Sequence, residues 1–237
     1  MIEPTVAWIS FRALFGRKRA LLFVLPAIVL IVLTLALKSA RGTLSDWPAL
    51  ILGQVGIGAV VPLTALLVGT SVLGSEIDDN SVLHLLATPV SRRSVIVSKT
   101  AVSAAVTAVF AGIPVLLAGL VAVGPHKLAF GCFLGALIGS LLYSCLFVMI
   151  SAALRHPVAY ALGYVALWEG LINHLVSGTK WLSVEDWSLG IANSIAHNGN
   201  LKANLTATPS IIMCVIAAVL LILYATERLS AFTVRAD

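Results

Sequence analysis

Charged residues are scarce in this sequence. Asp, Glu, Lys and Arg make up 11% of the 237 residues, hydrophobic residues make up 59%, and the mean hydropathy is +1.04. Soluble domains carry about 25% charged residues, so the composition excludes an ordinary soluble fold and indicates a membrane protein. The pI near 9.4 does not indicate nucleic-acid binding, because the basic residues stand mostly beside apolar segments, where they orient a membrane protein.

Cysteines are few, and the sequence contains no nucleotide-binding motif. Cys132, Cys145 and Cys214 fall within apolar stretches without metal-ligand spacing, so we interpret them as small buried side chains. No Gly-rich loop ends in Gly-Lys-Ser/Thr, the motif that cradles nucleotide phosphates. We therefore expect no metal, cofactor or catalytic activity in this chain.

Long apolar runs dominate what is present. We predict an all-α polytopic fold with six transmembrane helices, over residues 20–37, 50–74, 100–123, 128–154, 158–176 and 210–225. Together they form one transmembrane domain, residues 20–237. Residues 1–19 combine aromatic side chains with a basic cluster and predict an N-terminal interfacial helix, with a disordered basic tail as the alternative. A cleaved signal peptide is disfavoured because the first apolar run is too long.

Glycine and proline mark special places in these spans. Gly131, Gly135 and Gly139 follow at four-residue spacing and leave bare backbone on one helix face, which favours a close helix neighbour. We favour a neighbour from the same subunit. Pro62 predicts a kink in the second span.

The longest loop, residues 177–208, contains the start of a further helix. Ser183 precedes Glu185 and Asp186, a capping residue followed by acids in the first turn. The apolar stretch 189–196 is too short to cross a bilayer, so we predict an extracytoplasmic helical hairpin or re-entrant segment.

Orientation follows from the lysines and arginines near the span ends. With a cytoplasmic N-terminus the inside carries Arg12, Arg17, Lys18, Arg19, Arg92, Arg93, Lys99, Arg155, Arg228 and Arg235, and the outside carries Lys38, Arg41, Lys127, Lys180 and Lys202. The positive-inside rule therefore places both termini and residues 75–99 in the cytoplasm, with the chain in the plasma membrane.

Residues 75–99 form the long polar interruption on that side. Acids at its start, an apolar run in its middle and Pro89 at its end delimit a short helix that needs a partner surface to be stable. The run Asp79-Asn80-Ser81, the leucines from Leu83 to Leu86 and Pro89-Val90-Ser91-Arg92 resemble the pattern after the second span of type-2 ABC transporter permeases. Asn80-Ser81 departs from the commoner Gly-Thr pair.

This resemblance, together with the six-span layout, implies the membrane subunit of an ATP-driven exporter. The segment would be a coupling helix, with the residues Glu76, Asp79, Asn80, Ser81, Leu83, His84, Leu85, Leu86, Pro89, Arg92 and Arg93 docking onto the ATPase. The resemblance implies two copies of an ABC ATPase, which bind ATP and Mg, and a second permease subunit, identical or homologous. The physical argument agrees, because apolar side chains flanked by charges suit a groove on a partner.

Glu169 is the one acid deep inside a predicted span. An ionisable group in hydrocarbon is costly unless it is paired, hydrated or protonated. It marks a translocation path or subunit interface, together with Asn173, Gln54 and Tyr164, or it makes a structural hydrogen bond to a neighbouring helix. A hydrolase or metal site with His174 is disfavoured, because five-residue spacing splits the two side chains across a helix.

Two function classes remain. The first is the permease subunit of an ABC exporter for a hydrophobic or amphipathic compound such as a drug, a peptide antibiotic or a lipid. The alternative is a secondary, proton-linked transporter or a non-transporting membrane scaffold.

Overall fold

The computed structural model describes residues 8, 14, 20–41, 46–78, 92–124, 126–197, 200, 201 and 203–231. All regular elements within these ranges are helices, as predicted. The interfacial helix predicted over residues 1–19 lies almost wholly outside the described ranges, so it stays a prediction.

The helices are long and joined by short connections. The first part of the chain forms α2 (Ala20–Arg41), a continuous helix of α3 (Trp47–Leu50), η1 (Ile51–Val60) and α4 (Val61–Asp78), and a continuous helix of α6 (Arg92–Thr107), η2 (Ala108–Gly112) and α7 (Ile113–Val123). The second part forms α8 (Lys127–Ala153), a helix of α9 (Pro157–Gly163), η3 (Tyr164–Ile172) and α10 (Asn173–Leu175), then η4 (Ser177–Leu182), α11 (Val184–Ala196) and α12 (Ala207–Ala231).

Within the described ranges, 5 helices are long and apolar enough to cross a membrane: Leu22–Ala40, Trp47–Val72, Arg93–Val123, Lys127–Ala153 and Ala207–Arg228. They coincide with the predicted first, second, third, fourth and sixth spans. The predicted fifth span corresponds to a shorter apolar helix, Pro157–Ile172. The chain is therefore an all-helical, multi-pass membrane protein.

One boundary differs clearly from its prediction. The third span was expected to begin at Thr100, but its helix already begins at Arg92. Arginine and lysine are good helix formers, so the polar residues before the apolar run continue the helix instead of breaking it.

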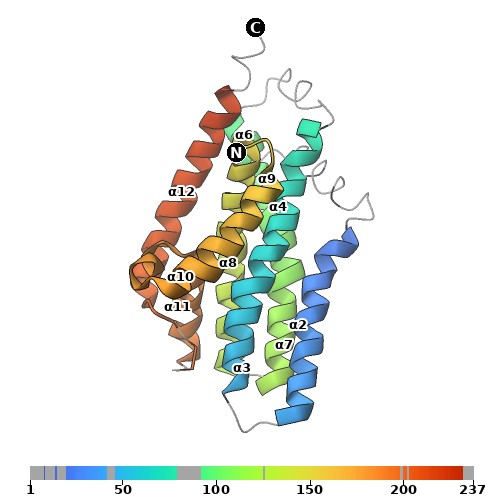
Figure 1. The fold of residues 1–237 in the computed structure, drawn as a ribbon, viewed down its shortest axis with the longest axis vertical. Coiled ribbons are helices and arrows are strands. Elements are labelled where there is room, and N and C mark those ends of the chain that lie inside the picture. The colour runs from blue at the N-terminus through green and yellow to red at the C-terminus, as the bar shows by residue number, and fades with distance from the viewer. Residues whose placement is uncertain are drawn as a thin grey trace.

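The helices pack as one elongated bundle (Figure 1). At its upper end in this view α4 ends, α6 begins and α12 ends, whereas α2 begins lower down and α3 stands at the lower end. We call the upper end the α4–α6 end. α11 lies beside the lower half of the bundle. With 13 residues it is about 20 Å long, too short to cross a bilayer core.

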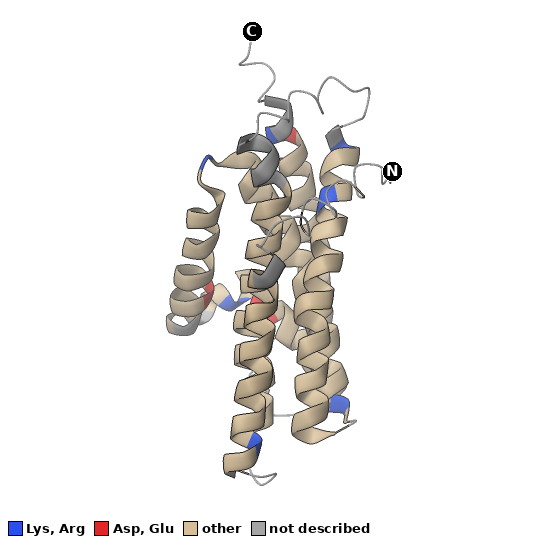
Figure 2. Cartoon of the chain, turned by 90° about the vertical axis from the view of Figure 1, so that its right-hand side faces the viewer, with Lys and Arg blue, Asp and Glu red and all other residues tan. Residues whose placement is uncertain are grey.

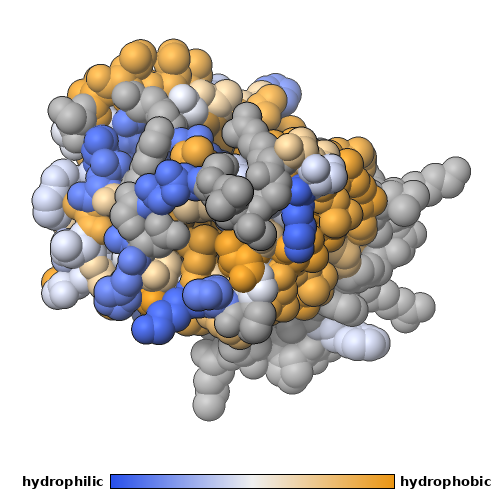
Figure 3. All heavy atoms as spheres, turned by 90° about the horizontal axis from the view of Figure 1, so that it is seen from below, coloured by the Kyte–Doolittle hydropathy of each residue, from blue (hydrophilic) through white to orange (hydrophobic). Residues whose placement is uncertain are grey.

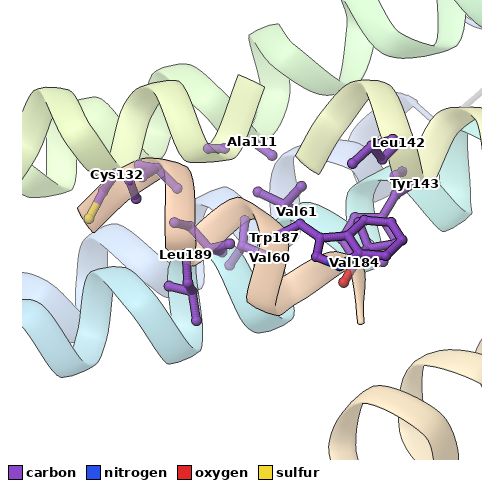
Figure 4. Close-up of a cluster of buried hydrophobic side chains, with 14 of the residues drawn as sticks. Val60, Val61, Ala111, Cys132, Leu142, Tyr143, Val184, Trp187 and Leu189 are labelled. Carbon is purple, nitrogen blue, oxygen red and sulfur yellow. The ribbon is translucent and has the colours of Figure 1, made fainter. Parts of the chain in front are cut away.

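The centre of the bundle is α8. In the apolar stretch of α8 61% of the residues are buried, against 28% in α2 and 11% in α12, so the last two helices lie at the periphery. The main hydrophobic cluster joins α8 to α4 and α11. Figure 4 shows Tyr143 of α8 and Val61 of α4 in this cluster, together with Trp187 and Leu189 of α11.

Two stretches of wide, π-type helix precede prolines. η1 and η2 each end two residues before a proline, Pro62 and Pro114. The N–H groups of Val61 and Ile113 bond to carbonyl oxygens five residues back. A proline ring clashes with the carbonyl four residues before it, so the hydrogen-bond ladder shifts there. At Pro62, where the sequence predicted a kink, the helix widens into π-type turns.

Charged residues are few on the bundle (Figure 2). Lys and Arg lie mainly towards the two ends, whereas Asp and Glu also occur at mid-height. Figure 3 views the end opposite to the α4–α6 end, where hydrophilic residues gather over part of the face and hydrophobic surfaces rise beside them. Charged residues at mid-height are unusual, because the ends of membrane helices meet water and their middles meet lipid.

Candidate functional site

Residues 75–99, predicted to dock onto a partner, comprise the end of α4, residues 79–91 and the start of α6. Eight of the predicted site residues are outside the described ranges: Asp79, Asn80, Ser81, Leu83, His84, Leu85, Leu86 and Pro89. The others flank residues 79–91. Glu76 lies in the last turn of α4, and Arg92 and Arg93 lie in the first turn of α6, where Arg93 is exposed. The docking role of all these residues stays a prediction.

A buried lysine joins the two helices that flank residues 79–91. Lys99 of α6 is 1% exposed, and its Nζ donates to the carbonyl oxygen of Val72 in α4 at 3.1 Å. A buried ammonium group is tolerated only when its hydrogen bonds are made within the protein. α4 and α6 are therefore joined about two turns away from their ends at residues 78 and 92.

A network of polar side chains is buried where η3 meets α8 and α11. At its centre is Glu169, which is 1% exposed. Tyr143 Oη (3.2 Å), Tyr164 Oη (3.0 Å) and the main-chain N–H of Val184 (3.1 Å) donate to Oε1, and Ser183 Oγ (2.6 Å) donates to Oε2. These donors replace the water that the carboxylate loses, which explains how an acid is accommodated in an apolar helix.

Asp186 of α11 belongs to the same network. Asn173 Nδ2 donates to Ser183 Oγ at 3.0 Å and to Asp186 Oδ2 at 2.7 Å. Asn204 Nδ2 donates to Asp186 Oδ1 at 2.6 Å, and Lys180 Nζ donates to Asn204 Oδ1 at 2.9 Å. Ser183 also caps α11, as its position in the sequence predicted, because its Oγ accepts the main-chain N–H of Asp186 at 3.1 Å. The start of α11 is thus fixed to η3, α10 and η4.

Glu185, in the same first turn of α11, has a different environment. It is 7% exposed, and its carboxylate lies against Gly58 of η1, where a Cβ would stand 2.5 Å from Oε1. Among the described residues no hydrogen bond or ion pair reaches this carboxylate. Burial, with Glu169 and Asp186 close by, raises the pKa of Glu185 to about 8. Burial therefore favours the protonated form of this carboxyl group.

The structure brings together three of the four residues that the sequence put forward around Glu169. Glu169, Asn173 and Tyr164 share one network of hydrogen bonds. Gln54 is exposed on η1 and takes no part in it within the described chain. Whether any of them lines a translocation path stays a prediction.

Sequence reasoning missed Tyr143 and gave Glu185 and Asp186 only a local role, as acids that stabilise a helix start. Their burial depends on α11 lying against α8. The available signal was the glycine face of α8, whose close neighbour is α11 of the same chain. A Cβ on Gly135 would lie 2.7 Å from the main-chain oxygen of Ser188.

No group of three or more His, Cys, Asp or Glu side chains in the described chain could hold a metal ion. Cys132, Cys145 and Cys214 are free and buried, which confirms their interpretation as small interior side chains. The chemistry of the site is therefore that of buried carboxyl groups and their hydrogen bonds.

The fold and these sites define a class of protein, an all-helical membrane protein whose long helices form a single bundle. The sequence comparison adds the family. Residues 15–174, more than half of the chain, match the family described as ABC-2 family transporter protein, and the chain belongs to this family. No curated protein and no solved structure matches it.

Family membership makes the chain an ABC-type membrane permease component, a kind of subunit that is generally not itself an enzyme and that implies an ABC ATPase partner. The matched residues run from before α2 into α10 and include Lys99 and Glu169. α11 and α12 follow the matched part, so Glu185 lies beyond it.

Proposed function

We propose that this chain is the permease subunit of an ABC exporter and provides the translocation path for a hydrophobic or amphipathic substrate. The observation that carries this is the family match over residues 15–174, combined with the α4–α6 end of the bundle. There two long helices, joined through Lys99 and Val72, flank the segment with the docking pattern. Force applied to that segment would reach both helices together.

The partner in this proposal is a separate ABC ATPase in two copies, which binds ATP and Mg. The chain pairs with a second permease, identical or homologous, in the plasma membrane. Both termini and the α4–α6 end face the cytoplasm, supported by the excess of Lys and Arg on that side. Pro157–Ile172, continued by α10, is the fifth of the six spans in this arrangement.

We assign Glu169 a positioning role within the permease. Its four hydrogen-bond donors come from α8, η3 and the start of α11, and they occupy both carboxylate oxygens. A carboxylate engaged in this way holds α11 against the bundle. This favours the structural interpretation of Glu169 over direct contact with substrate.

Co-purification of this chain with a candidate ABC ATPase tests the proposal. Leu83→Asp with Leu86→Asp is expected to abolish ATPase binding, because two charges cannot enter an apolar groove unpaired. The matched control, Leu83→Met with Leu86→Met, keeps apolar side chains of similar volume and is expected to retain binding. Undiminished binding of the aspartate variant would show that the segment does not dock.

Transport without an ATPase would favour the alternative function, a secondary transporter. In proteoliposomes that hold the permease without an ATPase, we expect no uptake of a lipophilic dye driven by a proton gradient. With the ATPase, ATP and Mg present, we expect uptake. Accumulation driven by the gradient alone would overturn the exporter proposal.

A further inference from the structure

The first turn of α11 is held from several sides. The glycine face of α8 lets the α11 backbone approach closely, since a Cβ on Gly135 would lie 2.7 Å from a main-chain oxygen of α11. On another side Gly190 of α11 meets Ser210 of α12. Small residues on both faces thus let α11 pack closely against the bundle. In this position the side chain of Glu185 lies on η1 at Gly58.

Hydrogen-bond donors are shared unequally among the three acids of this region. Glu169 receives four donors. Asp186 receives the side-chain amides of Asn173 and Asn204. Glu185 receives none from the described residues, although it is 7% exposed. It is the one acid of the three whose ionised form nothing in the described chain solvates.

The titratable groups that face Glu185 come from every side of the contact. η3 supplies Glu169, α11 supplies Asp186 and α8 supplies Tyr143, and a negative charge on any of them opposes a charge on Glu185. η1 has no ionisable side chain, and the first three turns of α12 carry no charged one. Lys180 of η4 is bonded to an amide oxygen instead. The described residues therefore offer Glu185 no compensating cation.

Protonation is the least costly way to neutralise such a cluster. Neighbouring carboxylates repel each other at low dielectric, and the group without donors takes the proton first. A metal ion or an ammonium group needs space and several ligands. The Glu185 carboxylate already touches Gly58, and no described group of side chains could hold a metal. A proton needs no cavity.

We propose that Glu185 is a proton-binding site that couples the docking of α11 onto η1 to protonation. The docked helix holds Glu185 as the neutral acid. When α11 leaves η1 the carboxyl group reaches water and releases its proton there, and redocking takes one proton back from water. One proton is exchanged per cycle and no other reactant is needed. The inference goes beyond the permease function and does not depend on it, because it concerns contacts within this chain alone.

Infrared difference spectroscopy of the full chain in lipid nanodiscs tests the proposal directly. The carbonyl stretch of a protonated carboxylic acid is followed from about pH 5 to about pH 10, with glutamate side chains isotope-labelled. The wild-type chain is expected to show a glutamic-acid band that disappears with a midpoint near pH 8. Glu185→Gln is expected to lose this band entirely. Its matched control, Glu227→Gln on exposed α12 surface, is expected to keep it.

Two results would overturn the proposal. One is a wild-type spectrum without a titrating glutamic-acid band, which needs no variant and is independent of how any variant folds. The other is a band of the same amplitude and midpoint in Glu185→Gln, which would assign the proton to another acid. Hydrogen exchange of the α11 amides provides the link to docking. The ratio of the wild-type exchange rate to the Glu185→Gln exchange rate, both measured at the same pH, is expected to increase as pH rises through 8. Equal rates throughout would refute the coupling.

Discussion

Removing Glu169 is expected to release α11 from the bundle. Glu169→Ala takes away the acceptor of four donors at once. Two of them cannot turn to water, because Tyr143 is fully buried and Val184 is nearly so. A buried donor left without a partner costs about 1–3 kcal/mol, so we expect Glu169→Ala to lower the free energy of unfolding by about 2–6 kcal/mol.

Milder substitutions should follow in a predictable order. Glu169→Gln keeps the acceptor for Tyr143 and Val184 but turns an amide group towards Ser183, whose Oγ already accepts two hydrogen bonds. One hydrogen bond is then lost, which costs about 0.5–1.5 kcal/mol. Tyr143→Phe removes one donor to a charged acceptor and is expected to cost about 1.5–3 kcal/mol. The control, Gln54→Ala, changes an exposed side chain outside the network and should cost little.

The assay is reversible unfolding of the full chain in mixed micelles, with hydrogen exchange of the α11 peptide measured on the same samples. Faster exchange in α11 should accompany each loss of stability. If Glu169→Ala is as stable as Gln54→Ala and its α11 amides exchange at the wild-type rate, the positioning role is refuted. Unchanged stability with lost transport would instead place Glu169 on the translocation path.

Three further perturbations follow from the contacts. The free energy of unfolding should fall by up to about 5 kcal/mol as pH rises from 4.5 to about 8, because folded Glu185 keeps a proton that the unfolded chain has released. Thermal scans should show this decrease of stability with pH in Glu227→Gln but not in Glu185→Gln. Gly135→Ala should destabilise by about 1–3 kcal/mol because its Cβ meets α11 backbone, whereas Gly163→Ala, with open space around it, should stabilise by up to about 1 kcal/mol; unfolding midpoints decide this. Lys99→Met should leave ATPase binding intact but lower substrate-stimulated ATP turnover, and wild-type turnover would contradict its role in joining α4 to α6.

The long helices were predictable because a bilayer leaves few choices for an uninterrupted apolar run. The predicted fourth span, residues 128–154, differs by one residue at each end from Lys127–Ala153. Helix boundaries that fall within polar sequence were harder to predict than those at the ends of apolar runs. The helix that begins at Arg92 shows why, since charged residues with high helix propensity do not mark a helix end.

The candidate site was only partly predictable. Glu169 and Asn173 stand one turn apart on one helix, so their proximity follows from local geometry. Tyr143 reaches Glu169 only because α8 packs against η3, and Glu185 reaches the same place only because α11 docks on α8. A helix start with two acids has a complete local explanation without that second contact. The glycine face of α8 predicted a close neighbour but carries no information about which helix it is.

One continuous helix, from Trp47 to Asp78, touches both sites. Near its α4–α6 end the carbonyl oxygen of Val72 accepts the hydrogen bond from Lys99, and in η1 Gly58 supports the carboxyl group of Glu185. Pro62 stands between these two contacts, where the π-type ladder of η1 returns to α-helix. Glu185 packs against bare backbone at Gly58. Gly58 has no side chain that could move to keep this contact when the helix is displaced. A rotation or shift of this helix at its α4–α6 end therefore acts on the Glu185 contact unless the wide turns before Pro62 absorb it.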